Sequence, residues 1–359
     1  MQKGRALSVQ TFSRQGQAIP FAGEENDAAK QDQAPWREIL PYLPPVLREI
    51  VCRLPGEVLK QLEEIRLRLG KPLIVGLPGK DRLVGEGGAL VEEMDRAYRV
   101  TEDDIQRVTQ LVSGCSLYAF EEELKNGFIT LPGGHRVGLA GRAVVENGRV
   151  KTIKHITAVN IRLSREVTGI AGPLLPYLFD CKTASILHTL IFSPPRCGKT
   201  TLLRDLVRQI SNGVPELNIP GFTVGLVDER SELAGCCRGV PQRDVGIRTD
   251  VLDGCPKAEG MIILLRSMSP QVIATDEIGS REDVAALEEV FNAGVKVLVT
   301  VHGSSLAELS SRPSLSYLLG LKVIERFVLL GRSAGIGTVE EIIDGRTLLP
   351  LKVGRKSRG

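Results

Sequence analysis

A segment of nine residues, Ser-Pro-Pro-Arg-Cys-Gly-Lys-Thr-Thr over 193–201, constrains the fold of this chain more than any other feature. It lies between an apolar run, Ile186 to Phe192, and an amphipathic run, Leu202 to Ile210. A strand, a glycine-containing loop ending in Gly-Lys-Thr, and a helix are the parts of a phosphate-binding P-loop. Because the first N–H groups of the helix and its dipole converge on one spot, the expected ligand is a polyphosphate.

Every residue of this loop is a candidate for the nucleotide site. The candidates are Ser193, Pro194, Pro195, Arg196, Cys197, Gly198, Lys199, Thr200 and Thr201. Lys199 can reach the β- and γ-phosphates, and the Thr200 hydroxyl can ligate Mg²⁺. We expect Lys199 to be exposed at the loop. The alternative interpretation is an ordinary strand-to-helix turn with a solvated lysine.

The loop departs from the usual pattern at its first position. The motif has Gly five residues before Gly198, where this chain has Ser193. That position often takes a backbone conformation that glycine adopts most easily. Pro194 and Pro195 have no N–H to donate, so the amides of 196–200 would have to hold the phosphates.

The composition is that of a globular protein. The chain has 359 residues, of which 42% are hydrophobic and 25% charged, and this length fits two domains. A net charge of +3 is too small to indicate a nucleic-acid partner. We expect no membrane-spanning helix, because no apolar run approaches about 18 residues, and no signal peptide. The odd number of cysteines, seven, is typical of reduced thiols in a cytoplasmic protein.

The first half of the chain has the pattern of a smaller α+β domain. Residues 1–36 are poor in large apolar residues and are expected to be disordered; the domain itself is expected over 37–165. Thr101, followed by three acids, is a predicted helix N-cap. Helices are predicted over 36–53, where prolines interrupt the pattern, and over 57–64, 101–112 and 116–124. Strands are predicted over 65–69, 71–75, 127–130, 135–139, 142–145, 150–153 and 159–163.

The second half alternates strands and helices. A linker over 166–182 leads into a domain over 183–351, and a basic tail covers 352–359. Strands are predicted over 185–192, 222–227, 271–275 and 295–301, and helices over 200–210, 257–268, 281–292 and 304–312. Such alternation predicts an α/β fold with a parallel sheet and covering helices. At the end, a strand over 326–330 is followed by a hairpin in which Asp344-Gly345 joins 339–343 to 347–351.

Two acids follow the predicted strand 271–275. They lie at the carboxyl edge of the sheet, where the P-loop also opens. We assign Asp276 to Mg²⁺, because a P-loop needs a carboxylate from a neighbouring strand, and Glu277 is placed to orient the attacking water. The alternative is that an acidic pair follows an apolar strand by chance.

A second acidic segment, Asp228-Glu229-Arg230-Ser231-Glu232, follows the strand over 222–227. It reaches the same edge, so Glu229 competes with Glu277 for the role of base. The alternative is a capped loop in which Arg230 forms a local ion pair.

One histidine and three arginines complete the candidates. His302 ends the strand over 295–301 and would sense the γ-phosphate or bridge to a neighbouring subunit, although isolated histidines are often structural. Arg266, Arg248 and Arg162 are candidates for stabilising transition-state charge. An arginine supplied by a neighbouring subunit increases the rate by roughly 10³–10⁵-fold. The alternative for each is surface charge.

These motifs, in this order, resemble those of the stage III sporulation protein AA family. The resemblance rests on residues 193–206, 227–234, 268–279 and 300–303, and on 127–138, which is similar to the family's N-terminal signature. It covers roughly residues 40–350 and implies an ATPase of endospore-forming bacteria, related to the ring-forming ATPases of type II and type IV secretion.

The resemblance implies a RecA-like, AAA-type P-loop NTPase core that uses ATP and Mg²⁺. It also implies a hexamer, peripheral at the cytoplasmic face of the mother-cell membrane around the forespore. There the hexamer would power a secretion-like channel built with other, membrane-anchored stage III proteins.

By the same resemblance, Asp228-Glu229 corresponds to the acidic box of the secretion ATPases and His302 to their histidine box. Those ATPases usually have Gly-Glu where this chain has Asp276-Glu277, so the catalytic glutamate is either Glu229 or Glu277; we favour Glu229.

Two other functions are consistent with the same motifs. One is a structural ring that binds ATP to assemble and turns over little, an interpretation that the departure at Ser193 keeps open. The other is a nucleic-acid-dependent P-loop ATPase. The near-neutral charge and the single Trp argue against a nucleic-acid channel lined by stacking aromatic residues.

Overall fold

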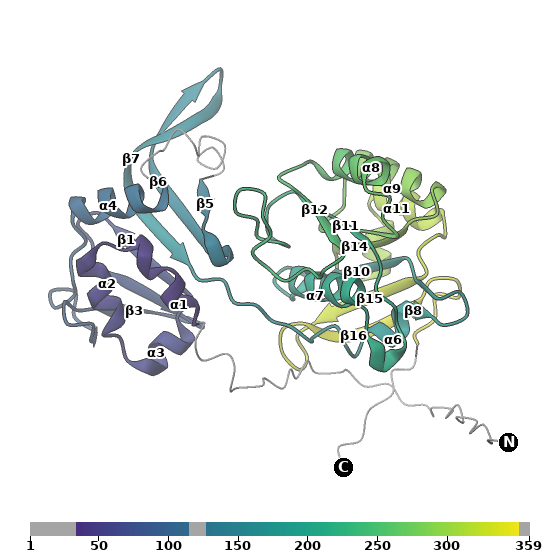
Figure 1. Cartoon of the computed structure of the whole chain (residues 1–359), viewed down its shortest axis with the longest axis horizontal. Helices are drawn as coiled ribbons and strands as arrows, with labels where there is room; N and C mark the ends of the chain where they lie inside the picture. Colours follow the sequence, from purple (N-terminus) through teal and green to yellow (C-terminus); the bar gives the residue numbers. More distant parts are fainter. Residues whose placement is uncertain (1–33, 115–126, 352–359) are drawn as a thin grey trace, which may run out of the picture. The chain divides into compact units, whose positions relative to one another are not determined.

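The structure, a computed structural model, describes residues 34–114 and 127–351, which form two compact units (Figure 1). The N-terminal unit contains 34–166 together with 235–243, and the P-loop unit contains 167–234 and 244–351. The helix predicted over 116–124 lies outside the described residues, as do residues 1–33 and the tail after Leu351. Those predictions stay untested.

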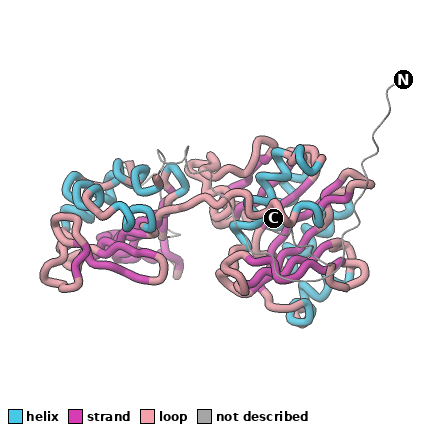
Figure 2. Tube along the Cα trace, turned by 90° about the horizontal axis from the view of Figure 1, so that it is seen from below, coloured by secondary structure: helices cyan, strands magenta, loops and turns pink. Residues whose placement is uncertain are grey.

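The N-terminal unit is an antiparallel sheet with helices on one side of its strands (Figure 2). The strand order is β4-β3-β2-β1-β7-β6-β5. The strands are β1 (Glu64–Arg68), β2 (Ile74–Leu77), β3 (Lys80–Val84), β4 (Leu90–Val91), β5 (Phe128–Thr130), β6 (Arg136–Glu146) and β7 (Arg149–Arg162). The helices are α1 (Pro35–Glu38), α2 (Pro45–Cys52), α3 (Gly56–Gln61) and α4 (Glu102–Val112), with 3₁₀ turns η1 (Leu40–Tyr42) and η3 (Pro132–Gly134).

Local sequence signals explain the helical side of this unit. The Thr101 hydroxyl accepts the N–H of Asp104 at 3.1 Å, and the Asp104 carboxylate accepts the N–H of Thr101 at 2.9 Å. This capping box confirms the predicted start of α4.

Ile65 and Leu67 of β1 are buried in the core that the helices cover, so Arg66, between them, belongs to the opposite face of the sheet.

The P-loop unit is a seven-stranded, mostly parallel sheet with helices packed against it (Figure 1). The strand order is β12-β11-β13-β14-β10-β15-β16, and only the last pair is antiparallel. The strands are β10 (Thr189–Ser193), β11 (Val224–Asp228), β12 (Thr249–Asp253), β13 (Val272–Thr275), β14 (Lys296–His302), β15 (Arg326–Gly331) and β16 (Thr338–Asp344), and β8 (Phe179–Asp180) pairs separately with β9 (Ser185–Ile186). The helices are α6 (Leu175–Leu178), α7 (Lys199–Asn212), α8 (Lys257–Ser267), α9 (Arg281–Asn292), α10 (Leu306–Ser310) and α11 (Pro313–Gly320), with the 3₁₀ turn η4 (Pro215–Leu217). The predicted α/β fold is confirmed.

Some of the predicted elements are wrong in detail. The helix predicted over 304–312 is the shorter α10, and the sequence analysis did not predict α11, which Pro313 begins because a proline cannot continue the preceding helix. The strand predicted over 347–351 is reduced to an isolated bridge between Ile343 and Pro350. The Asp344 carboxylate accepts the N–H groups of Arg346 and Thr347, which continues the turn instead.

The long hairpin of β6 and β7 replaces several short predicted strands. The strands predicted over 135–139 and 142–145 are one strand, with a register shift at Gly141. A Cβ at Gly141 would lie 2.6 Å from the His155 carbonyl oxygen, so glycine lets the two backbones approach closely there. The sequence analysis did not predict β12, whose pattern Thr-Asp-Val-Leu-Asp is polar at both ends.

Candidate nucleotide-binding site

Four adjacent strands end at the same edge of the P-loop unit. In sheet order they are β11, β13, β14 and β10, and every neighbouring pair is parallel. Because parallel strands share their carboxyl edge, the residues after them gather in one region. The structure therefore brings the P-loop, the Asp276-Glu277 pair, the 228–232 segment and His302 to a common edge.

The P-loop has the backbone geometry of an anion site. Gly198 is the N-cap of α7 and has a φ of 86°, in the left-handed region that favours glycine. A Cβ there would lie 3.3 Å from the Cα of Gly337, so the loop before β16 also limits this position. Arg332 also contacts the loop, since its Nη2 donates to the Arg196 carbonyl at 2.6 Å. Since the N-cap residue Gly198 has no side chain that could cap α7, the first N–H groups of the helix are not occupied by its N-cap residue.

The other loop residues differ in exposure. Pro194, Pro195 and Arg196 are exposed, Cys197 is buried, and Gly198, Thr200 and Thr201 are half-buried. Thr200 and Thr201 thus lie, half-buried, in the first turn of α7.

Ser193 is compatible with its position without strain. It is the last residue of β10, pairs with His302 of β14 and is fully buried. Its carbonyl accepts the N–H of Gly303 at 3.1 Å, as in a regular strand. Because the backbone is extended there, the left-handed conformation that would call for glycine does not arise, and the missing first glycine is explained.

Lys199 is buried, contrary to the prediction that it is exposed. Only 5% of its surface is accessible. Its Nζ lies 2.9 Å from His302 Nδ1 and donates to the Ser193 hydroxyl at 3.2 Å and to the Ser193 carbonyl at 3.3 Å. Burial lowers the pKa of the Lys199 ammonium, against the charge of Glu277, which raises it. In this structure the ammonium of Lys199 therefore donates to groups at the ends of β10 and β14. The sequence analysis predicts phosphate oxygens as its partners when nucleotide is bound.

Lys199, His302 and Glu277 form a continuous hydrogen-bonded chain. An ammonium can only donate, so His302 Nδ1 must accept, and the ring proton is on Nε2. Nε2 then donates to Glu277 Oε1 at 2.7 Å. Glu277 has a φ of 46°, unusual for a residue other than glycine, and its N–H is held by the Thr300 hydroxyl at 2.9 Å. Strain of this kind is typical of functional sites.

Asp276 has the properties of a cation ligand. It is 2% exposed, and burial, followed by the charges of Asp228 and Glu277, raises its pKa to about 6. Carboxylate and hydroxyl oxygens suit Mg²⁺, and a surplus of buried negative charge is relieved by a divalent cation. The donor set of Asp276 and Thr200 therefore fits the metal.

Asp228 is a structural cap. Its carboxylate accepts the N–H groups of Glu232, Leu233 and Ala234 at 2.8–2.9 Å and is fully buried. This agrees with the capped loop that the sequence left open. Arg230 Nη1 pairs with Glu277 Oε2 at 3.3 Å, which links this loop to the residue pair that follows β13.

Glu229 is ion-paired with Lys257, the first residue of α8. The Lys257 side chain is 10% exposed and that of Glu229 is 34% exposed. Sequence reasoning missed Lys257, although a lysine directly after Pro256 at a predicted helix start is an unusual choice where acids are preferred.

Two predicted arginines lie away from the site of their own chain. Arg248 Nη1 donates to the carbonyls of Ser211 and Asn212 at the far end of α7, whose 14 residues span about 20 Å. Arg266 is in the last turn of α8 and 75% exposed, 3.9 Å from Glu289. Both precede strands, so they lie toward the amino edge of the sheet, opposite the P-loop.

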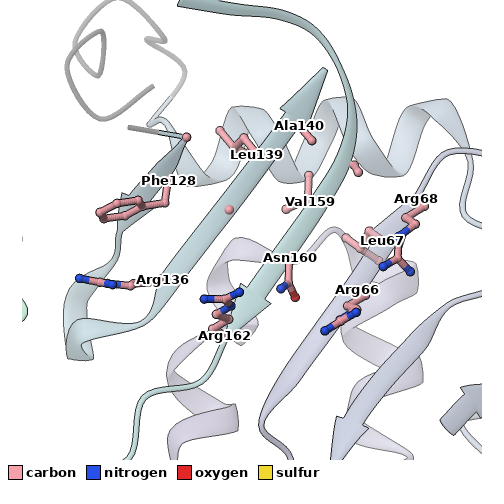
Figure 3. Close-up of a pocket in the computed structure, with 13 residues that line it drawn as sticks. Arg66, Leu67, Arg68, Phe128, Arg136, Leu139, Ala140, Val159, Asn160 and Arg162 are labelled. Carbon is pink, nitrogen blue, oxygen red and sulfur yellow. The ribbon is translucent and has the colours of Figure 1, made fainter. Parts of the chain in front are cut away.

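Arg162 lies in the N-terminal unit, at one side of a groove on the face of the sheet opposite the described helices (Figure 3). Arg66, Arg68 and Arg136 also line this groove, whose volume is about 500 Å³. Arg136 stacks on Phe128 with its guanidinium carbon 4.7 Å from the ring centre. Two of these arginines are also close to a carboxylate, since Arg66 is ion-paired with Glu64 and Arg162 lies 3.9 Å from it.

The chain has relatives that share most of its length. The profile of the family described as "Sporulation stage III, protein AA" matches residues 34–349. Stage III sporulation protein AA of Bacillus subtilis (strain 168) is 45% identical over 307 residues, which cover 86% of this chain and 94% of the relative. Protein SEEDLING PLASTID DEVELOPMENT 1 of Arabidopsis thaliana is 24% identical over 283 residues, 78% of this chain and 35% of that protein.

Two solved structures are similar over most of the chain. The Legionella pneumophila ATPase DotB has a TM-score of 0.49 at 16% identity and covers 79% of this chain and 77% of its own. The pilus retraction motor PilT with bound ADP has a TM-score of 0.48 at 16% identity and covers 78% of both chains. Within residues 34–114 and 127–351, no helix combines the length and apolar character needed to cross a membrane.

Proposed function

The chain belongs to the family described as sporulation stage III, protein AA, and on that premise we propose that it is an ATPase that acts in sporulation. One observation carries the proposal: the P-loop, Asp276 and His302 lie at the carboxyl ends of adjacent parallel strands. A triphosphate at the N-terminus of α7 would meet a lysine, a buried carboxylate and a histidine at once.

In this proposal, nucleotide binding exchanges the partners of Lys199. The ammonium leaves His302 and the carbonyl of Ser193 and donates to the β- and γ-phosphates, while the amides of 196–200 hold the remaining oxygens. His302 loses its partner at Nδ1 and, on taking up a proton there, would donate to the γ-phosphate, while Nε2 still donates to Glu277. Phosphate binding at His302 would therefore change its hydrogen bond to Glu277 and, through Glu277, the ion pair with Arg230.

Thr200 and Asp276 are the residues that would hold Mg²⁺. When bound, Mg²⁺ supplies positive charge that neutralises the phosphates as the terminal bond breaks. Asp276 contributes a carboxylate that burial has kept from full solvation, and the Thr200 hydroxyl contributes a second oxygen from the first turn of α7.

We assign Glu229 to the activation of water and Glu277 to the orientation of His302. Glu229→Gln is expected to lower kcat by about 10²-fold or more, the usual range for loss of a general base, with a small effect on the KM for ATP. Glu277→Gln is expected to lower kcat less, because its carboxylate acts through the histidine. Steady-state phosphate release from both variants tests this, with the exposed Glu216→Gln as control. A larger loss for Glu277→Gln than for Glu229→Gln would exchange the two roles.

We further propose that activity requires a ring of subunits, six by the family resemblance. Arg266 and Arg248 lie toward the amino edge of the sheet, opposite the P-loop of their own unit, so in this proposal an arginine acts on the site of a neighbouring subunit, with Arg162 as the third candidate. Specific activity is expected to rise with protein concentration and to level off where light scattering shows the oligomer. Full specific activity at dilutions that contain only monomer would exclude this idea.

The sporulation role that we propose is to energise a secretion-like channel between mother cell and forespore. The chain would lie on the cytoplasmic side of the mother-cell membrane, held there by membrane-anchored stage III proteins. Co-purification of this chain with membranes from sporulating cells, lost when those partners are deleted, is the test.

One observation favours a ring with little turnover. Glu229 is paired with Lys257, and Glu277 with His302 and Arg230, so both candidate bases are engaged. If wild type and Glu229→Gln release phosphate at the same low rate while ATP still promotes assembly, the ring is structural. Stimulation by single-stranded DNA that falls with salt would favour the nucleic-acid alternative instead.

A further inference from the structure

Lys257 occupies a position where a cation is electrostatically unfavourable. It is the first residue of α8, at the positive end of the helix dipole, and only 9% of the residue is exposed. A buried ammonium at this end of a helix is destabilising unless nearby carboxylates compensate for it. Its presence here requires an explanation beyond helix stability.

The packing of α8 fixes where the Lys257 side chain lies. Gly260, three residues later and thus on the same face of the helix, packs against β11. A Cβ at Gly260 would lie 2.6 Å from Val227 Cγ1, so glycine allows the helix to approach the strand closely. Lys257 is therefore held over the end of β11, and its Nζ donates to Glu229 Oε2.

Lys257 interacts with two carboxylates at this edge of the sheet. Its Nζ is ion-paired with Glu229, and its charge also acts on Asp276. Asp276 is in turn influenced by the negative charges of Asp228 and Glu277. The charge of Lys257 opposes the rise in the pKa of Asp276 that burial and its acidic neighbours cause.

We propose that Lys257 is a positioning residue for Glu229, holding one carboxylate oxygen so that the other faces the attacking water. The ion pair takes up Oε2 and leaves Oε1 to accept a hydrogen bond. Because Lys257 belongs to α8 and Glu229 to the loop after β11, the pair also ties that loop to the helix. This inference rests on the proposed ATPase function and on Glu229 as the base.

Kinetics of Lys257 variants test the proposal. Lys257→Met is expected to lower kcat about 10–10²-fold, part of the contribution of the base itself, and to change the KM for ATP by less than about threefold. Lys257→Arg keeps a cation and should restore much of the rate. In the Glu229→Gln background, Lys257→Met should add less than about twofold, because the residue acts through the missing carboxylate. An equal loss in both backgrounds, or a change in KM alone, would overturn the proposal.

A matched ion pair separates positioning from stability. Lys296 Nζ pairs with Glu325 Oε2 at 2.9 Å in the same sheet, with both side chains largely buried, but at the start of β14, away from the P-loop. Lys296→Met should lower the melting temperature as Lys257→Met does and leave kcat unchanged. If both variants lose activity in proportion to their melting temperatures, Lys257 is merely structural. Lys257→Gln, which retains a hydrogen-bond donor, replaces Lys257→Met if the latter does not fold.

A measurement without nucleotide distinguishes this inference from the proposed function. Melting temperatures of the wild type, Lys257→Met, Glu229→Gln and the double variant in EDTA form a double-mutant cycle. Non-additive shifts are expected, since Glu229→Gln leaves the buried Lys257 ammonium without its carboxylate, a penalty that Lys257→Met removes in the double variant. Additive shifts would show that the pair does not couple in solution. If the wild type itself releases no phosphate, the ATPase proposal fails, whatever the cycle gives.

Discussion

Replacing Lys199 with alanine is expected to reduce ATP turnover by at least about 10²–10³-fold, the range for the loss of one group that stabilises developing charge. In the proposed reaction the ammonium is the side-chain cation that the P-loop supplies to the β- and γ-phosphates. Phosphate release by the purified variant is the measurement. Lys182→Ala, a change of an exposed lysine in the same unit, is the control and should be indistinguishable from wild type. Turnover at the wild-type rate in Lys199→Ala would contradict the site.

The same substitution is expected to change stability little, although Lys199 is buried. The variant loses the hydrogen bonds to Ser193 and His302, each of which contributes about 1 kcal/mol. It also removes a desolvated ammonium, whose burial lowers its pKa and therefore opposes folding in the charged form. These effects have opposite signs, so the melting temperature without nucleotide should shift by only a few degrees. ATP and Mg²⁺ should raise the melting temperature of the wild type and not that of the variant.

The sequence predicts the edge at which the site lies but not the contacts within it. A P-loop and an apolar strand ending in Asp276 are local patterns, and parallel strands bring such ends together. The burial of Lys199 depends on His302, which lies 103 residues away in the chain. Likewise, Glu229 meets Lys257 only because β11 and α8 pack together. Contacts between residues so far apart in the chain cannot be predicted from the local spacing of residue types.

The fold shows the same division between local and non-local information. Thr101 and the acids after it predict the start of α4, because the capping box is made within four residues. No local pattern predicts that residues 235–243, which follow the capped loop of Asp228, belong to the N-terminal unit. There the side chain of Gln242 accepts the N–H of Gly133 at 3.0 Å, a contact across 109 residues.

Asp276→Asn is expected to abolish turnover and, in the absence of metal, to stabilise the protein. Asp276 is 2% exposed, and burial first, then the charge of Asp228, raises its pKa to about 6 from the usual 3.8. The folded state therefore binds this proton more tightly than the unfolded state. Each unit of pKa corresponds to about 1.4 kcal/mol, so the ionised carboxylate opposes folding by at most about 3 kcal/mol. An asparagine of nearly the same shape carries no charge and avoids this penalty.

The pH dependence of the free energy of unfolding tests this prediction, because the raised pKa of Asp276 fixes the direction of the change. Between about pH 4 and pH 6 the folded state holds more protons than the unfolded state, so the free energy of unfolding falls as pH rises through that window. In EDTA, Asp276→Asn should melt above the wild type at pH 8, and the difference should shrink toward pH 4. Asp250→Asn, a half-buried carboxylate on β12, controls for the loss of one negative charge. A variant that melts below the wild type at pH 8, or a difference independent of pH, would contradict this account of Asp276. With Mg²⁺ and ATP the order should reverse, because only the wild type gains the energy of binding.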